Sequence, residues 1–460
     1  MTEALLDAHG VPVALDANET APVSSSDSLK VQPNEYYQSK LSVIAQHRKH
    51  DGIRARLPLE QTPGLISLLA GKPHPSTFPF KSFSMVLRDA VDPEKEIPVQ
   101  LTQEELEIGL QYSAGNGIPS LIEWVYGLQE IAHGRKKGEG WTVSIGSGSQ
   151  DLIYKAVTAL INPGDSVLME VPTYAGVSPM FQSLQCEIIE IEMDSNGILS
   201  HSLREKLENW PVGKPKPKVL YTVPYGCNPS GATATLERRE EVLALAQEHD
   251  FIILEDDPYH FLYYGSAPRP PSYFALEKDV ASPGRVIRFD TLSKILSSGM
   301  RLGFVSGPEL LVNTIHAHTN VANLQPNTLA QVLAMAVLSR WGHQGFLEHA
   351  DRVAQFYRKK RDIFQAAMTR HLSGLAEWTP PEAGMFMWFR LLLGNEDPSL
   401  DDSDLLIQSK AFERGVLVLP GSVFYPNSRV SAYVRASFSL MEEKEVDEAL
   451  RRLRLAILEN

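Results

Sequence analysis

The sequence has little cysteine, no long apolar run and an excess of acidic over basic residues. Its 460 residues include only Cys186 and Cys227, far apart and without Cys-x-x-Cys or Cys/His spacing, so neither a disulfide framework nor a metal site is expected. Apolar stretches such as residues 329–338 are much shorter than the roughly 20 residues that span a bilayer. The formal net charge of -13 disfavours nucleic acid and anionic membranes as partners.

The first thirty residues, 1–30, are predicted to be a flexible leader. They carry Asp7, Glu19 and Asp27, and they lack the arginines of a transit peptide and the apolar core of a signal peptide. A reducing compartment suits two unpaired cysteines, so we expect the protein in the cytoplasm. Hydrophobic residues at 43% and charged residues at 22% are typical of a globular protein, and the length predicts two or three domains.

Short β-rich runs alternate with longer helical stretches after residue 141, which indicates an α/β fold with a mostly parallel sheet. Seven strands are predicted for this sheet, at residues 141–145, 166–170, 186–191, 219–223, 251–255, 286–289 and 302–305. Residues 82–345 are predicted to form this large domain, and residues 346–460 a smaller α+β domain. Residues 31–81 are rich in proline and glycine and are predicted to be an N-terminal arm that joins the small domain.

Lys294 lies in the segment Thr291-Leu292-Ser293-Lys294-Ile295-Leu296-Ser297-Ser298-Gly299-Met300-Arg301. An amine can form a Schiff base with a carbonyl, and nearby hydroxyls with an arginine can hold a phosphate dianion. Pyridoxal phosphate carries both of these groups, so the segment points to that cofactor. For this segment alone, a surface lysine in a serine-rich turn remains the alternative.

Ligands of open α/β sheets gather where strands end, and the first predicted strand ends in the loop at residues 146–151. This loop opens a helix whose free amides and positive dipole end suit a phosphate, with Ser149 and Gln150 as the expected donors. A dinucleotide site is less favoured because the third glycine of Gly-x-Gly-x-x-Gly is absent. A plain helix cap remains open.

Carboxylates follow the predicted strand at residues 251–255, where their burial would be costly without a cationic partner. Asp256 is expected to pair with a protonated pyridine nitrogen and so preserve the ring's capacity as an electron sink. Tyr259 could donate to the phenolic oxygen of the same ring. The alternative is a solvated Asp-Asp-Pro turn.

Three further side chains fit the same cofactor and its substrate. Asn228, beyond the strand at residues 219–223, could hydrogen-bond the phenolic oxygen, or it could belong to an ordinary loop. Tyr174 could stack on the pyridine ring, or it could pack on the domain surface. Arg435, on a short strand of the small domain, matches a substrate carboxylate in bidentate fashion, although a lone arginine is usually a surface charge.

Together these motifs resemble those of the fold-type I aminotransferases, and within them the kynurenine/2-aminoadipate and fungal aromatic amino acid aminotransferases. The similarity runs from about residue 61 to residue 453. The motifs are residues 147–150, Pro-Thr-Tyr 172–174, Asn-Pro-Ser-Gly 228–231, Asp-Asp-Pro-Tyr 256–259, Ser-Lys 293–294, Arg301 and Arg435. The resemblance implies that Lys294 forms the internal aldimine and moves the proton, with Asp256 and Tyr174 as further catalytic residues. It also implies that Asn228, Asp256, Tyr259 and Tyr174 hold the ring, and that Ser149, Gln150, Thr291, Ser293 and Arg301 contact the phosphate.

The resemblance further implies a homodimer in which Tyr112 reaches the neighbour's phosphate and Gly71 lines the substrate pocket. Phe386 would supply an apolar wall of that pocket, or it would belong to the core of the small domain. Thr291 stands where relatives often carry serine, and Ala70-Gly71-Lys72 departs from the Gly-Gly-Leu of close relatives. The second departure leaves the choice of substrate open.

The predicted function is that of a pyridoxal phosphate-dependent aminotransferase with a ping-pong mechanism. The amino donor would be a bulky L-amino acid of aromatic, kynurenine or 2-aminoadipate type, and the acceptor a 2-oxo acid such as 2-oxoglutarate. A lyase or decarboxylase on the same fold is the alternative. A DNA-binding regulator is disfavoured because the short acidic leader leaves no room for a DNA-binding domain.

Overall fold

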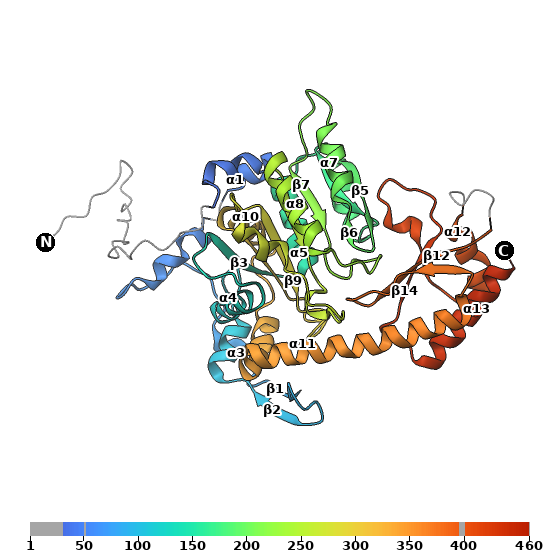
Figure 1. Cartoon of the computed structure of the whole chain (residues 1–460). Coiled ribbons are helices and arrows are strands. Elements are labelled where there is room, and N and C mark those ends of the chain that lie inside the picture. The colour runs from blue at the N-terminus through green and yellow to red at the C-terminus, as the bar shows by residue number, and fades with distance from the viewer. Residues whose placement is uncertain (1–30, 50–51, 395–400, 460) are drawn as a thin grey trace.

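The computed structural model describes residues 31–49, 52–394 and 401–459 (Figure 1). The predicted leader, residues 1–30, lies outside the described residues. The centre of the molecule is an 8-stranded sheet. Its order is β3 (Trp141–Gly146), β10 (Gly303–Pro308), β9 (Val286–Thr291), β8 (Ile252–Asp256), β7 (Val219–Thr222), β4 (Ser166–Val171), β5 (Glu187–Asp194) and β6 (Gly197–Ile198).

All seven predicted strands are present, and β6 adds a short hairpin partner that pairs Gly197 with Asp194 of β5. The five neighbours from β9 to β5 run parallel. Strand β10 is antiparallel to both β3 and β9. The predicted α/β fold with a mostly parallel sheet is therefore confirmed.

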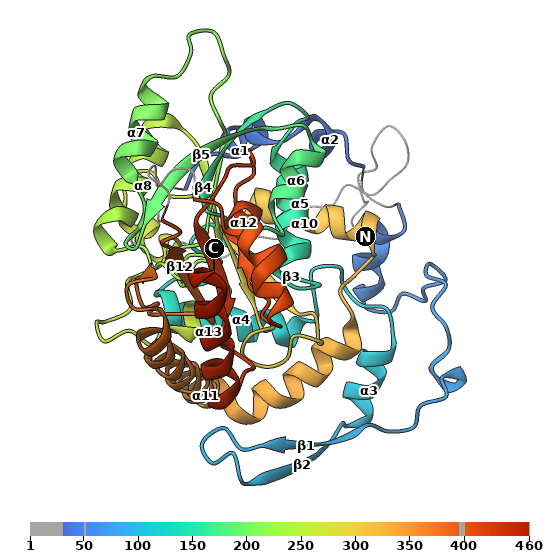
Figure 2. The same cartoon turned by 90° about the vertical axis from the view of Figure 1, so that its right-hand side faces the viewer.

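Alternate residues of the central strands enter two separate cores, because successive side chains of a strand point to opposite faces. Leu168 of β4 and Ile253 of β8 belong to one core, whereas Val167 and Met169 belong to the other. The first core includes α4 (Pro119–His133), α7 (Ser200–Glu208), α8 (Leu236–His249) and α9 (Tyr273–Leu276). The second includes α5 (Ser149–Leu160), α6 (Ser178–Ser183) and α10 (Glu309–Ala322). Figure 2 shows α7 and α8 on one side of the sheet and α5 and α6 on the other.

The C-terminal part of the chain forms a 4-stranded antiparallel sheet. Its order is β11 (Ala376–Trp378), β12 (Phe386–Leu391), β14 (Tyr433–Ser437) and β13 (Leu419–Pro420). It shares a core with α12 (Ser403–Leu406), the π-helical turn Ile407–Ala411 and α13 (Glu443–Leu458). This sheet carries Phe386 and Arg435, the two predicted substrate-binding residues of the small domain.

Helix α11 (Thr328–Leu372) runs from the large sheet to the small one, as Figure 1 shows. Its only non-helical residue is Gly342, with φ 63 and ψ -177, so two helices meet there at a kink. The predicted domain boundary at residues 345/346 falls just after this kink.

The described residues before α4 form short elements. They are α1 (Asn34–Lys40), α2 (Val43–Gln46), the 3-10 helices Arg54–Gln61 and Pro75–Thr77, the hairpin of β1 (Ser84–Arg88) and β2 (Glu96–Gln100), and α3 (Gln103–Leu110). Further 3-10 turns span His260–Leu262, Glu277–Asp279 and Gly421–Phe424.

The start of the predicted arm lies against the helices of the large sheet. Ser42 N donates to Ala159 O at 2.7 Å, and Lys40 Nζ donates to Asp250 O at 2.8 Å. The division into domains stays a prediction.

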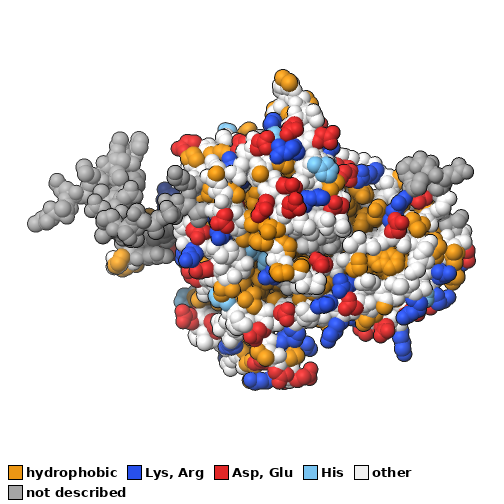
Figure 3. Space-filling model, in the orientation of Figure 1, with side chains coloured by type: hydrophobic (Ala, Val, Ile, Leu, Met, Phe, Trp, Pro, Cys, Tyr) orange, Lys and Arg blue, Asp and Glu red, His pale blue; other side chains and the backbone are white. Residues whose placement is uncertain are grey.

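The surface shows acidic and basic side chains intermingled over the face seen in Figure 3. Among the helices of the described ranges, none combines the length and apolar character needed to cross a membrane.

Candidate active site

A cavity of about 200 Å³ lies at the carboxyl ends of the parallel strands. It is lined by Ser149, Gln150, Tyr174, Val223, Asn228, Asp256, Pro258, Tyr259, Thr291, Ser293, Lys294, Arg301 and Phe386. All the lining residues except Phe386 lie at or just after the carboxyl ends of β3, β4, β7, β8 and β9, because parallel strands present these ends at one edge of the sheet. Phe386 comes from β12 of the small sheet. The structure therefore brings ten predicted cofactor residues and the predicted substrate residue Phe386 into one site.

One end of the cavity suits a phosphate. Helix α5 begins at Ser149 without a side-chain cap, so its first amides stay available as donors. Arg301 Nη1 donates to Ser293 Oγ at 3.2 Å, and Thr291 Oγ1 donates to the same oxygen at 2.9 Å. Arg301 has φ 52, a conformation that arginine rarely adopts, which is typical of residues held at functional sites. The Gln150 side chain instead donates to Gly176 O at 2.7 Å.

The other end contains a buried carboxylate with spare acceptor capacity. Asp256 is 4% exposed, and its Oδ2 accepts from the Tyr221 hydroxyl at 2.6 Å. Its Oδ1 is buried and has no hydrogen-bond partner among the described residues. Burial raises the pKa of Asp256 to about 6, while the Tyr221 donor opposes this rise. An orphaned carboxylate oxygen in the cavity wall fits a cationic ring nitrogen, which would relieve the unfavourable burial.

Lys294 lies in the loop that follows β9 and is half-buried. Within the described ranges, its amine takes part in no hydrogen bond or ion pair. Burial lowers the pKa of Lys294, Arg301 lowers it further, and Asp256 opposes the shift. A lowered pKa increases the fraction of free amine, which is the form that attacks an aldehyde. Lys294 is therefore suited to form a Schiff base.

Arg435 approaches the cavity from β14 of the small sheet. Its Nη1 donates to Asn228 Oδ1 at 2.9 Å, and its guanidinium lies 4.3 Å from the ring centroid of Phe386. Its Nε is buried without a partner among the described residues. Phe386 also packs edge-on against Tyr259, with ring centroids 6.3 Å apart. A guanidinium with an unused donor beside the cavity can bind a carboxylate.

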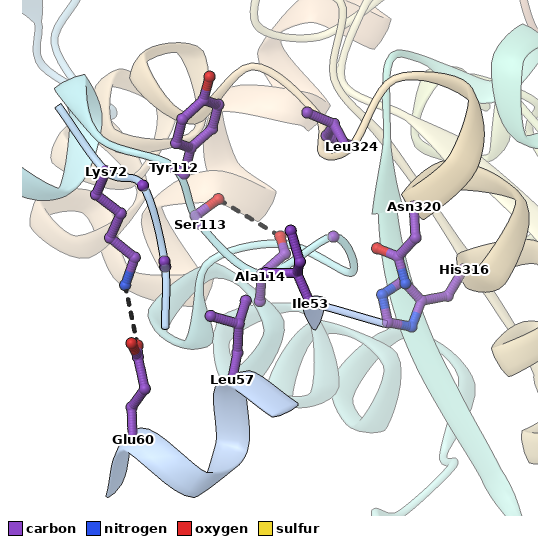
Figure 4. Close-up of a pocket in the computed structure, with 13 residues that line it drawn as sticks. Ile53, Leu57, Glu60, Lys72, Tyr112, Ser113, Ala114, His316, Asn320 and Leu324 are labelled. Atoms are coloured by element: carbon purple, nitrogen blue, oxygen red, sulfur yellow. Dashed lines mark hydrogen bonds and ion pairs between the residues drawn. The ribbon is translucent and has the colours of Figure 1, made fainter. Parts of the chain in front are cut away.

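Tyr112 and Gly71 do not line the cavity of Lys294. Both lie instead in a separate cavity of about 670 Å³, shown in Figure 4. Lys72 and Glu60 form an ion pair of 3.3 Å at its edge, and Tyr112 is 54% exposed. Within one chain, these two residues are thus apart from the other predicted site residues.

The sequence prediction missed Tyr221, Val223 and Pro258. Tyr221 lies within β7, where a single buried tyrosine resembles ordinary core. The usable signal is that a buried tyrosine hydroxyl needs a hydrogen-bond partner, and Asp256 at the end of the adjacent β8 provides it.

This arrangement suits an enzyme that holds a phosphorylated aldehyde against a lysine, and comparison with known proteins defines its family. Residues 94–453 match the family described as aminotransferase class I and II. Aminotransferase tdiD of Emericella nidulans is 44% identical over 403 residues, covering 87% of this chain and 91% of the relative. The mitochondrial kynurenine/alpha-aminoadipate aminotransferase of Bos taurus is 39% identical over 440 residues, covering 92% of this chain and 99% of the relative.

A solved structure, that of Pyrococcus horikoshii kynurenine aminotransferase, is 31% identical, has a TM-score of 0.70, and covers 92% of this chain and 98% of its own. The chain belongs to the class I and II aminotransferases. It is an aminotransferase, as the sequence predicted, and the relatives do not support the lyase or decarboxylase alternative.

The glycine before α5 provides a test of the phosphate end. Gly148 has φ 88, and a Cβ added there would lie 2.4 Å from Arg301 Nη2. We expect Gly148→Ala to weaken binding of pyridoxal phosphate about 10- to 100-fold, because the guanidinium must leave its place. Fluorescence titration of the apoenzyme measures this affinity. Gly138→Ala is the control, since Gly138 has φ 93 but no atom within 4 Å of an added Cβ. Equal affinities of the two variants would contradict the expected role of Arg301.

The pKa of Asp256 predicts how cofactor affinity depends on pH. The ionised carboxylate attracts a cationic ring, so affinity should fall as the pH drops through about 6. In Tyr221→Phe the carboxylate loses a donor that stabilises its charged form, so its pKa rises and the loss of affinity begins about one pH unit higher. Titrations across the pH range measure both midpoints, and comparison with the unsubstituted enzyme cancels the cofactor's own titration.

The control for this experiment is Tyr225→Phe. Tyr225 is also a buried tyrosine, but its hydroxyl donates to Pro270 O and not to Asp256. An unchanged midpoint in Tyr221→Phe, or an equal shift in Tyr225→Phe, would show that the hydroxyl does not tune Asp256.

Proposed function

We propose that this aminotransferase uses pyridoxal phosphate to move the amino group of a bulky L-amino acid to a 2-oxo acid such as 2-oxoglutarate. The donor would be of aromatic, kynurenine or 2-aminoadipate type. The observation that carries the proposal is that one cavity is lined by both Lys294 and Asp256. Neither the Lys294 amine nor Asp256 Oδ1 has a hydrogen-bond partner among the described residues. The name of the bovine relative supports this donor class, and the Pyrococcus structure contains PMP with KYN as substrates and KYA as products.

The cavity residues would hold the cofactor by complementary groups. Pyridoxal phosphate supplies an aldehyde for a Schiff base and a cationic ring that accepts electrons from the bound substrate. The α5 amides at Ser149 and Gln150, with the hydroxyls of Thr291 and Ser293 and the Arg301 guanidinium, would bind its phosphate. Asp256 would hold the proton on the ring nitrogen, Asn228 and Tyr259 would bind the phenolic oxygen, and Tyr174 would pack against the ring.

Lys294 and Arg435 would perform the steps that this chain contributes directly. Arg435 binds the substrate carboxylate, and Asn228 orients its guanidinium through the 2.9 Å hydrogen bond. Phe386 provides an apolar surface beside this guanidinium for a bulky side chain. Lys294 Nζ, as a free amine, would take the proton from the substrate α-carbon and would deliver it to the cofactor carbon that carried the aldehyde, not back to the substrate. Its lowered pKa favours this role as a base.

A homodimer would complete the site. Tyr112 and Gly71 lie outside the cavity of Lys294 within one chain, so the phosphate and substrate contacts predicted for them require a second copy. The arm near Gly71 exposes large apolar side chains, with Ile66 91% and Leu68 98% exposed. Exposed apolar groups of this size are typical of a surface that a partner covers. The cytoplasm stays the predicted compartment, although the bovine relative is named as mitochondrial.

Lys294→Ala tests the proposed chemistry. We expect turnover to fall by at least about 10²- to 10⁴-fold, because the variant lacks the amine that moves the proton. A single-turnover assay with kynurenine, 2-aminoadipate and aromatic donors measures oxo acid and pyridoxamine phosphate, which should form in equal amounts in the unsubstituted enzyme. Lys444→Ala, at an exposed lysine of α13, is the control. Release of carbon dioxide, or of ammonia without pyridoxamine phosphate, would overturn the proposal.

Leu68→Asp tests the proposed dimer. A charge on a covered apolar surface is expected to dissociate the dimer and to weaken cofactor binding about tenfold or more, because each site then loses the neighbour's Tyr112. Sedimentation velocity gives the mass, and titration gives the affinity. Val212→Asp is the control, since Val212 is fully exposed at a loop far from the arm in sequence. A monomeric unsubstituted enzyme with full cofactor affinity would contradict the dimer.

A further inference from the structure

Lys294 lies in a single turn of irregular chain between β9 and β10. Leu292 O accepts hydrogen bonds from Leu296 N at 2.9 Å, and from Ile295 N and Ser297 N at 3.3 Å each. No helix or strand fixes the lysine, and its amine has no partner within the described ranges. The position of the amine therefore depends on whatever holds this turn in place.

A histidine of α11 contacts the turn at the residue next to the lysine. His349 Nε2 lies 2.9 Å from Ile295 O. On its other side, Arg352 Nη2 lies 2.9 Å from His349 Nδ1. An arginine only donates, so Nδ1 accepts, and the ring hydrogen must be on Nε2. His349 is thus a donor to the Ile295 carbonyl, and its tautomer is set by Arg352.

The surroundings keep this imidazole neutral and oriented. Burial lowers the pKa of His349, the hydrogen bond to Ile295 opposes this, and Arg352 lowers the pKa further. The ring packs against Trp341, with centroids 4.7 Å apart at 35°. Arg352 also donates to Ala90 O, and to Val91 O at 3.3 Å, at the end of the β1–β2 hairpin. The His349 ring is therefore held from two sides, by Trp341 and by Arg352.

The same helix leads to the small sheet that carries Arg435. Helix α11 continues from His349 to Leu372, and its last turns enter the core of that sheet through Phe364, Met368 and Leu372. His349 thus links the turn of Lys294 to the element that supports the proposed substrate-binding arginine.

We propose that His349 is a positioning residue for Lys294: its Nε2–H holds the Ile295 carbonyl and keeps the lysine-bearing turn docked on α11. The effect of His349 on catalysis rests on the proposed function. The contact that docks the Lys294 turn on α11 is already present in the apoenzyme. Without the donor, the turn moves away from α11, and the Lys294 amine gains contact with water. The amine then loses part of the burial that lowers its pKa, while the charges that face it, Arg301 and Asp256, remain.

The test compares His349→Leu, which removes the donor, with His349→Gln, whose amide nitrogen can donate from a similar place. His343→Leu is the matched control, because His343 lies on the same helix and its Nε2 also contacts a backbone carbonyl, Trp124 O, at 2.8 Å. The first measurement uses the apoenzyme. Labelling of Lys294 by acetic anhydride is followed across pH by peptide mass spectrometry, with the exposed Lys444 as the internal reference.

In His349→Leu the pH midpoint for labelling of Lys294 should move upward, while His349→Gln and His343→Leu keep the midpoint of the unsubstituted enzyme. With pyridoxal phosphate bound, the pH midpoint of the visible absorption should also shift in His349→Leu alone. Its kcat should fall about tenfold with little change in KM, because the amine and not the substrate site is displaced.

An unchanged labelling midpoint in His349→Leu, or an equal shift in His343→Leu, would overturn the positioning role. If His349→Leu does not fold, as circular dichroism would show, His349→Ala replaces it as the variant without the donor: an upward shift that His349→Gln does not show supports the role, and an unchanged midpoint refutes it. Failure of the unsubstituted enzyme to form pyridoxamine phosphate would instead refute the proposed function, while the apoenzyme labelling still tests the docking.

Discussion

The burial of the Asp256 carboxylate at the end of β8 is the constraint on which the centre of the molecule depends. A carboxylate that is 4% exposed must be stabilised by donors or by a cation, and the protein itself supplies one donor, the Tyr221 hydroxyl. The second oxygen is left for a cation in the cavity. The cavity wall therefore presents a buried carboxylate oxygen that a cationic group would stabilise.

A second group of buried charges connects β8, which ends at Asp256, with β9, which precedes the turn of Lys294. Arg288 of β9 is 0% exposed, and its Nη1 donates to Asp257 Oδ2 at 2.8 Å. Its Nε donates to Asp290 Oδ2 at 2.9 Å, and Gln129 of α4 reaches the same carboxylate at 3.2 Å. Burial raises the pKa of Asp257, and the Arg288 guanidinium opposes this rise. Because a buried charge without its partner is strongly destabilising, this network ties the ends of β8 and β9 together. The end of β8 and the end of β9 are thus joined by buried ion pairs.

Between the two sheets, α11 has contacts that local sequence does not reveal. Its histidines at positions 343 and 349 each reach a backbone carbonyl of another element, one in α4 and one in the turn of Lys294. The kink at Gly342 lies just before both. The helix is therefore a structural link between the turn of Lys294 and the small sheet that carries Arg435.

Strands such as β8 and β9 were predictable because a strand covered on both faces is a continuous apolar run, and that signal is local. Asp256 and Asn228 were predicted as site residues because polar residues after such runs meet at one sheet edge. Lys294 was predicted because hydroxyls and an arginine surround it in the sequence, and all three residues line one cavity. Tertiary structure alone decided four other features. They are the antiparallel direction of β10, the hydrogen bond from Tyr221 to Asp256, the contact of His349 with Ile295, and the separate cavity of Tyr112. Each depends on which distant segments pack together, and no local pattern of residues specifies that.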